Sequence, residues 1–128
     1  MSISVVAAII RKDDRILITQ RLDNVHLGRL WEFPGGKVEP YETLHAALQR
    51  EILEELGVKI RIEREFFTVD YEYSSKSVRL HFFECTILEG ELQPLQVADL
   101  RWIKPENLGD FPFPPADTEL ISKLRSIS

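Results

Sequence analysis

The stretch from residue 36 to residue 58 places the tightest limits on how this 128-residue chain folds. It reads GKVEPYETLHAALQREILEELGV, and leucine or isoleucine recurs in it at positions 44, 48, 52 and 56. At about 3.6 residues per turn, these side chains form one apolar stripe along a helix. Gly57 suits the left-handed conformation in which helices often end. The pattern predicts a helix that packs on a core.

The same helix carries three glutamates beside the apolar stripe. Glu51, Glu54 and Glu55 fall on one face, with the small Ala47 one turn earlier. Like charges at this spacing destabilise an isolated helix by about 0.2–0.5 kcal/mol per pair, and near a core they also resist desolvation. Mg²⁺ and Mn²⁺ prefer oxygen ligands of this kind. The face is interpreted either as a divalent-cation site or as a solvated acidic surface.

Apolar and β-branched runs predict strands on both sides of this helix. The predicted strands cover residues 3–10, 15–19, 60–70, 78–88 and 100–103, with turns at 12–14 and 74–76 and a loop at 23–30. The pair Gly35-Gly36 allows a tight turn or a close backbone approach. Residues 117–126 form a last amphipathic helix with Leu120 facing inward. These elements predict a single α/β domain over residues 1–128, an α/β/α sandwich around a mixed sheet.

Composition excludes several classes of protein. The net charge of −5 argues against a surface that wraps nucleic acid, so a polyanionic substrate must be recruited through metal ions and a few local cations. Cys85 is the single cysteine, which rules out a disulfide framework. No apolar stretch reaches 18 residues, and the N-terminus is too lightly charged for a signal peptide. We therefore expect a soluble cytoplasmic protein with no membrane partner.

Written as G-x5-E-x7-R-E-I-x-E-E-x-G-V, the stretch from residue 36 resembles the Nudix box of the MutT-like diphosphate hydrolases at every position. The resemblance implies the Nudix-type sandwich fold and metal-assisted hydrolysis. It also implies one to three Mg²⁺ ions, with Mn²⁺ as a substitute. Their expected ligands are Glu51, Glu54, Glu55 and the backbone carbonyl of Gly36.

The resemblance also distributes the catalytic roles inside the box. Glu51 or Glu54 is the candidate general base, and the sequence does not choose between them, because metal ligation and proton transfer compete for the same oxygens. Arg50 is interpreted as the residue that fixes a glutamate through a charged hydrogen bond. Glu42 is interpreted as a structural or metal-shell acid of the preceding loop.

Outside the box, the segments LWEFPGGKVEP and FPPADTELISKL resemble two branches of the family. One branch cleaves 8-oxo-dGTP, and the other hydrolyses CTP and modified pyrimidine triphosphates. The 8-oxo-dGTP branch typically has an asparagine where this chain has Asp117. An ionised aspartate only accepts hydrogen bonds, from the cytosine N4 amino group or from the guanine N1–H and N2 amino group. A plain helix cap is the alternative role for Asp117.

Three further residues match substrate-binding positions of these relatives. Phe33 is a candidate wall of the base pocket, or else a core aromatic residue. Arg21 and Lys37 are candidates to pair with phosphate or sugar oxygens, although Arg21 also fits a solvated strand end. Gln96 departs from the glutamate that is common in this branch. Either the enzyme works without that acid, or Asp99 or another nearby acid replaces it.

The leading hypothesis is a nucleotide-pool enzyme that hydrolyses (deoxy)nucleoside triphosphates to a monophosphate and pyrophosphate, and so sanitises 8-oxo-dGTP. CTP or a modified pyrimidine triphosphate is the alternative substrate. Rival hypotheses are a diphosphate hydrolase for a nucleotide sugar or dinucleotide, and a nucleotide-binding module without catalysis. The expected partner is a small nucleotide, and the sequence leaves monomer and homodimer open.

Overall fold

The structure, a computed structural model, describes residues 2–73 and 76–126. In chain order its elements are β1 (Ser2–Lys12), β2 (Arg15–Gln20), β3 (Trp31–Glu32), β4 (Gly35–Lys37), α1 (Leu44–Leu56), β5 (Lys59–Tyr73), β6 (Lys76–Glu89), β7 (Asp99–Ile103), the 3₁₀ helices η1 (Pro105–Asp110) and η2 (Pro115–Asp117), and α2 (Thr118–Ser126).

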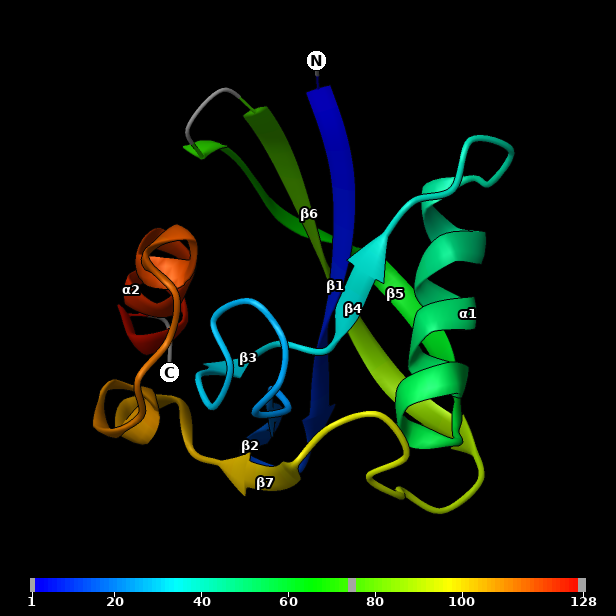
Figure 1. The fold of residues 1–128 in the computed structure, drawn as a ribbon. Coiled ribbons are helices and arrows are strands. Elements are labelled where there is room, and N and C mark those ends of the chain that lie inside the picture. The colour runs from blue at the N-terminus through cyan, green and yellow to red at the C-terminus, as the bar shows by residue number, and fades with distance from the viewer. Residues whose placement is uncertain (1, 74–75, 127–128) are drawn as a thin grey trace.

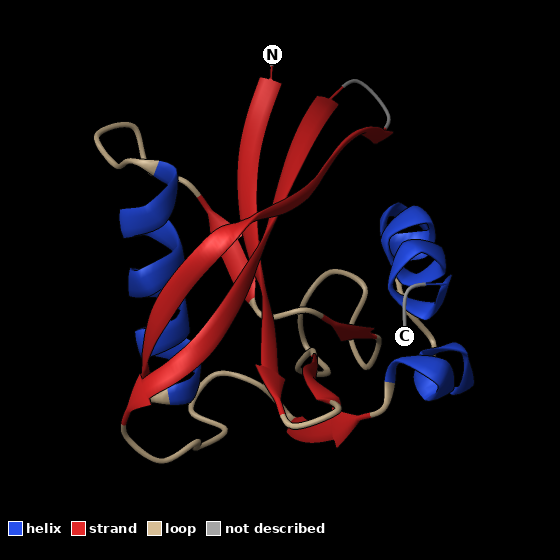
Figure 2. Ribbon diagram, turned by 180° about the vertical axis from the view of Figure 1, so that it is seen from behind, coloured by secondary structure: helices blue, strands red, loops and turns tan. Residues whose placement is uncertain are grey.

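The strands form one mixed sheet in the order β3-β2-β1-β6-β5, to which β4 adds beside β1 and β7 beside β2. Strands β1 and β6 run parallel, and the other pairs are antiparallel. Helix α1 covers one face of the sheet and α2 lies on the opposite side (Figure 1), as the view from behind also shows (Figure 2). The predicted α/β/α sandwich with a central mixed sheet is confirmed.

Alternate residues of β1 enter two separate cores. Val6 and Ala8 pack with Leu48 and the rest of the apolar stripe of α1. Ala7 and Ile9 point the other way and pack with α2. This alternation follows from the two-residue period of a strand. Strand β1 is therefore the wall that both layers share.

The predicted long strands and helices are confirmed, and most of them extend a few residues further than predicted. Of the predicted turn at 74–76, residues 74 and 75 lie outside the described residues, and Lys76 opens β6. Helix α1 ends at Gly57, whose φ of 72° is left-handed as expected. Helix α2 begins at Thr118, because Asp117 still belongs to the short turn η2.

Gly35 and Gly36 do not form the tight turn that the sequence allowed, because both lie in β4 and neither has a positive φ. The close backbone approach is confirmed. A methyl group on Gly35 would collide with the carbonyl oxygen of Val6 in β1. Within the described residues, no helix is long and apolar enough to cross a bilayer.

Candidate active site

Helix α1 fixes the direction of the acidic side chains. Thr43 caps its first turn, since the Thr43 hydroxyl accepts a hydrogen bond of 3.1 Å from the Ala46 amide. Leu48, Ile52 and Leu56 are fully buried against the sheet, so the rotation of the helix about its axis is set. This rotation places the Glu51 carboxylate beside β4, the Glu54 carboxylate toward solvent and the Glu55 carboxylate toward the interior.

Arg50 lies at the centre of the charged groups of the box. Its Nε and Nη2 donate to the two carboxylate oxygens of Glu42, at 2.6 and 2.9 Å. Its Nη1 donates to Glu51 at 2.8 Å and to Glu54 at 3.2 Å. The guanidinium lowers the pKa of Glu42 to about 2, because the hydrogen bonds favour the charged carboxylate. One cation thus holds three acids of the box together.

Gly36 provides the space in which the Glu51 carboxylate lies. A methyl group built on Gly36 would overlap the Glu51 side chain, with its Oε2 as the nearest atom. Any other residue would push this carboxylate off the backbone of β4. The glycine at the start of the box is therefore required by the packing of a glutamate from the end of the box.

Glu55 is the most buried acid of the helix. Burial, together with the nearby carboxylates of Glu32 and Glu51, raises the pKa of Glu55 to about 9, and the amide of Gly35 acts in the opposite direction. Its Oε1 atom is buried and has no hydrogen-bond partner among the residues that the structure describes. A neighbouring positive charge would satisfy this oxygen and offset the crowding of carboxylates.

The predicted metal ligands fit a hard divalent cation in their chemistry, because they are carboxylate oxygens and one of them is buried without a partner. They are not gathered into a closed cage. Among the described residues, no three His, Cys, Asp or Glu side chains converge as a ready-made metal site. Arg50 instead supplies the positive charge shared by Glu51 and Glu54. A divalent ion would therefore compete with this guanidinium for the same oxygens.

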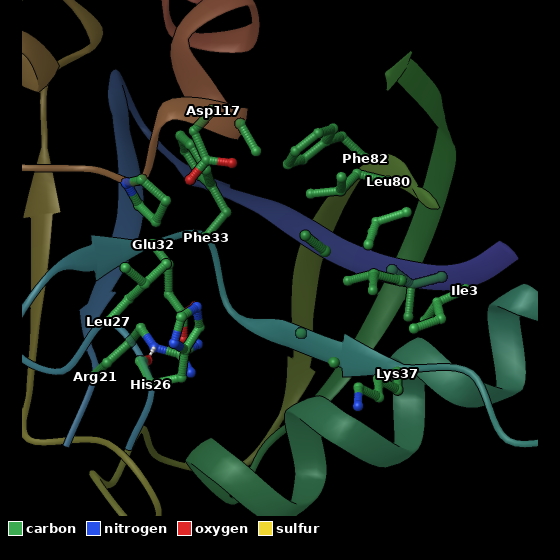
Figure 3. A pocket seen from close by; sticks show the side chains of 18 of the residues that line it. Ile3, Arg21, His26, Leu27, Glu32, Phe33, Lys37, Leu80, Phe82 and Asp117 are labelled. Atoms are coloured by element: carbon green, nitrogen blue, oxygen red, sulfur yellow. Dashed lines mark hydrogen bonds and ion pairs between the residues drawn. The ribbon is translucent and has the colours of Figure 1, made fainter. Parts of the chain in front are cut away.

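A cavity of about 670 Å³ opens on the α2 side of the sheet. Lys37 from β4 and Asp117 from the segment before α2 lie at opposite ends of the side chains labelled in Figure 3. Gly35 and Gly36 also line the cavity, so it reaches the strand beside the acidic helix. The apolar wall between the two ends includes Val5, Leu80 and Phe82. The shape and lining suit a flat apolar group with a charged tail.

The Asp117 carboxyl points into this cavity (Figure 3). The side chain is only 6% exposed, yet no described residue donates a hydrogen bond to it. Burial raises its pKa to about 7, with a further contribution from the charge of Glu32. The alternative role as a helix cap has no support, because a capping side chain would accept from an amide of α2. The carboxyl is left available for a ligand.

Phe33 combines the two roles considered for it, whereas Arg21 does not. Phe33 stacks on Phe113 at 5.5 Å between ring centroids and is 4% exposed, so it is a core residue that also lines the cavity. Arg21 is not a solvated strand end. It donates to the carbonyl of His26 at 2.8 Å and to the carboxylate of Glu32 at 2.9 Å. Its guanidinium still lines the cavity.

Glu32 is a site residue that the sequence reasoning missed. It lines the cavity, pairs with Arg21, and raises the pKa of both Asp117 and Glu55. Burial raises the pKa of Glu32 itself, which the neighbouring Arg21 opposes. The sequence did contain a signal for Glu32, because it lies between two aromatic residues in the run WEFPGG. An acid in such an apolar segment is seldom buried without a partner, so its position indicates a specific role.

Gln96 and Asp99 do not supply an extra acid to the cluster. The Gln96 side chain is exposed. The backbone amide of Gln96 donates to the backbone carbonyl of Glu55 at 3.3 Å and so holds the loop between β6 and β7 beside α1. Asp99 accepts from the Leu100 amide at 2.8 Å and from Arg101 at 3.4 Å. Because Leu100 packs in the core under α1, its strand neighbour Asp99 points to the other face. The expectation that Asp99 replaces the missing glutamate is therefore not supported.

Known proteins resemble this chain in sequence and in fold. A family model described as the NUDIX domain matches residues 5–123. A CTP pyrophosphohydrolase from Escherichia coli (strain K12) is 38% identical over 125 residues, which are 98% of this chain and 93% of the relative. An 8-oxo-dGTP diphosphatase from Buchnera aphidicola subsp. Schizaphis graminum is 36% identical over 97% of this chain and 94% of its own length. The solution structure of the E. coli ORF135 protein has a TM-score of 0.86 at 37% identity, over 98% of this chain and 90% of that chain.

Proposed function

Since this chain belongs to the NUDIX domain family and is a Nudix hydrolase of nucleoside triphosphates, we propose that it uses Mg²⁺ to release pyrophosphate and a nucleoside monophosphate. One observation carries the proposal. A cavity runs from the strand beside the acidic helix to the buried carboxyl of Asp117, to which no described residue donates a hydrogen bond. Its two ends match the two ends of a nucleotide.

The lining of the cavity supports a defined direction for the substrate. The base lies against Phe33 with its polar edge at Asp117, where an apolar wall meets one hydrogen-bonding group. The phosphates lie toward Lys37 and Gly36, where the Lys37 ammonium group and the backbone of β4 at Gly36, which carries no side chain, line the cavity. Arg21, held by Glu32, contacts the middle of the nucleotide.

At the phosphate end, Glu51, Glu54, Glu55 and the Gly36 carbonyl would hold Mg²⁺. When bound, the ion neutralises the polyphosphate charge and lowers the pKa of a coordinated water. The carboxylate of Glu51 or Glu54 accepts the proton from the attacking water, while Arg50 keeps both acids in place. The intact set of glutamates favours an enzyme over a nucleotide-binding module without catalysis.

The first candidate substrate is 8-oxo-dGTP. An ionised Asp117 offers two acceptor oxygens, which complement the adjacent N1–H and N2 amino donors of a guanine edge. A relative of this chain is named for this activity.

The second candidate is CTP or a modified pyrimidine triphosphate, and the raised pKa of Asp117 favours it specifically. A neutral carboxyl presents one donor and one acceptor side by side. This pair complements the cytosine N3 acceptor and N4 amino donor. Another relative is named a CTP pyrophosphohydrolase.

The test is pyrophosphate release at saturating Mg²⁺ from 8-oxo-dGTP, dGTP, CTP, dCTP, 5-methyl-dCTP and one nucleotide sugar. A Glu54→Gln variant with an unchanged circular dichroism spectrum is the control. We expect turnover of 8-oxo-dGTP or of the cytidine series that depends on Glu54. Turnover of the nucleotide sugar alone would replace this proposal with a diphosphate hydrolase, and a complete lack of turnover would favour the binding module.

A further inference from the structure

Two buried side-chain oxygens stand out because they have no hydrogen-bond partner. Across residues 2–73 and 76–126, the buried side-chain nitrogen and oxygen atoms in this condition are Thr19 Oγ1 and Glu55 Oε1. Thr19 is fully buried in β2. Leaving a buried hydroxyl unpaired costs about 1–3 kcal/mol, so a valine would pack better there if the hydroxyl had no role.

The pairing of the sheet shows which way Thr19 points. Thr19 lies opposite Glu32 of β3 and opposite Leu100 of β7. Residues directly opposite each other in antiparallel strands share a face of the sheet. Leu100, like Leu17 two residues before Thr19, packs in the core under α1. The Thr19 hydroxyl therefore lies on the face that the acidic helix covers, the face that it shares with Glu32.

Backbone hydrogen bonds bring the end of β2 close to Glu55. The Glu55 carbonyl accepts from the amides of Leu95 and Gln96, at 3.0 and 3.3 Å. Two residues later, the amide of Ala98 donates to the carbonyl of Gln20, the neighbour of Thr19, at 2.8 Å. This short loop ties the last turn of α1 to the end of β2. The two unpartnered oxygens thus belong to elements that are fastened together.

We propose that Thr19 is a positioning residue for the metal ligand Glu55. Its hydroxyl donates to a buried water that in turn donates to Glu55 Oε1, with the carboxylate of Glu32 as a further partner for the water. A buried water typically makes about three such bonds to otherwise unsatisfied groups. Metal-ligating carboxylates are commonly held by such outer partners, which fix the orientation of the ligand. This inference rests on the proposed metal site.

The matched variants are Thr19→Val, which keeps the shape and removes the hydroxyl, and Thr19→Ser, which keeps the hydroxyl. Binding of Mn²⁺ is measured without nucleotide by electron paramagnetic resonance, and kcat and KM are measured at a fixed Mg²⁺ concentration. We expect Thr19→Val to weaken Mn²⁺ binding by about 10–100-fold and Thr19→Ser to stay within about threefold of the unmodified protein. The KM for nucleotide at saturating Mg²⁺ is expected to be unchanged.

Wild-type affinity for Mn²⁺ in Thr19→Val, together with equal or greater thermal stability, would overturn the inference and leave Thr19 as a core residue. If Thr19→Val does not fold, Thr19→Cys replaces it, because a thiol is a similar but weak donor. A Glu55→Gln variant tests the proposed role of Glu55 as a metal ligand separately from the role of Thr19. Undiminished Mn²⁺ binding in Glu55→Gln would remove Glu55 from the metal ligands, and with it the premise of this inference, whatever the Thr19 variants show.

Discussion

The choice of base by Asp117 is expected to depend on pH. Burial places the pKa of this carboxyl at about 7. About nine tenths of the side chains are therefore neutral at about pH 6, and about nine tenths are ionised at about pH 8. The neutral form matches cytosine and the ionised form matches the guanine edge. A change of pH thus acts as a reversible substitution at one position of the site.

The size of the effect follows from these populations. If each base uses only its matching form, kcat/KM for CTP falls by about tenfold between these pH values, and kcat/KM for 8-oxo-dGTP rises by about tenfold. The ratio of the two then changes by roughly 100-fold, or about 2.7 kcal/mol, which lies within the range of about 1–3 kcal/mol for one well-made base contact. If only one of the two bases discriminates between the forms, the ratio changes by about tenfold.

The assay is pyrophosphate release from CTP and from 8-oxo-dGTP at saturating Mg²⁺, at several pH values between about 6 and 8. The ratio of the two kcat/KM values removes every effect common to both substrates. In Asp117→Asn, which has no group that titrates there, the ratio should be constant. A constant ratio in the unmodified protein, or the same slope in Asp117→Asn, would show that the protonation of Asp117 does not select the base.

Three other perturbations test the remaining parts of the site. Glu54→Gln should lower kcat by at least about 100-fold with little change in melting temperature, and retained turnover would remove Glu54 from the metal and base assignments. Gly36→Ala should displace the flexible Glu51 carboxylate, which weakens Mg²⁺ activation and lowers the free energy of unfolding by about 1 kcal/mol or less. In Gly35→Ala the new methyl group meets the backbone of β1, so the free energy of unfolding, measured by urea denaturation, should fall by more than about 2 kcal/mol. The reverse ranking of the two variants would contradict the packing described for β4. Folding raises the pKa of Asp117 from 3.8 to about 7, so the free energy of unfolding should fall as the pH rises between these two values. Relative to Asp117→Asn, the fall should reach up to about 4 kcal/mol. A difference between the two proteins that does not change with pH would show that the carboxyl is not desolvated.

Most of the fold could be predicted because its elements carry strong local signals. The four-residue spacing that includes Leu48 and Ile52 set both the existence and the rotation of α1, and β-branched runs marked the long strands. Strands β3 and β4 were missed because two or three residues show no periodicity. They exist through pairing with β2 and β1, which is a tertiary effect.

The distinction between local sequence signals and tertiary contacts also separates the predicted parts of the site from the unpredicted ones. The acids of α1 share one helix, so their neighbourhood follows from helical geometry alone. The pair of Arg21 and Glu32, and the burial of Asp117, depend on segments far apart in the sequence. A pKa near neutrality is a property of that burial and not of the residue type. It could therefore be found only after the fold was known.

The two-faced packing of β1 has a consequence for protein engineering. Ala8 and Ile10 support the acidic helix, while Val5 and Ala7 line the cavity on the opposite face. Side chains of neighbouring strand residues point to opposite faces, so the sheet lies between the two sets. A library restricted to the cavity face would therefore vary the proposed nucleotide pocket without replacing the side chains that support the acidic helix.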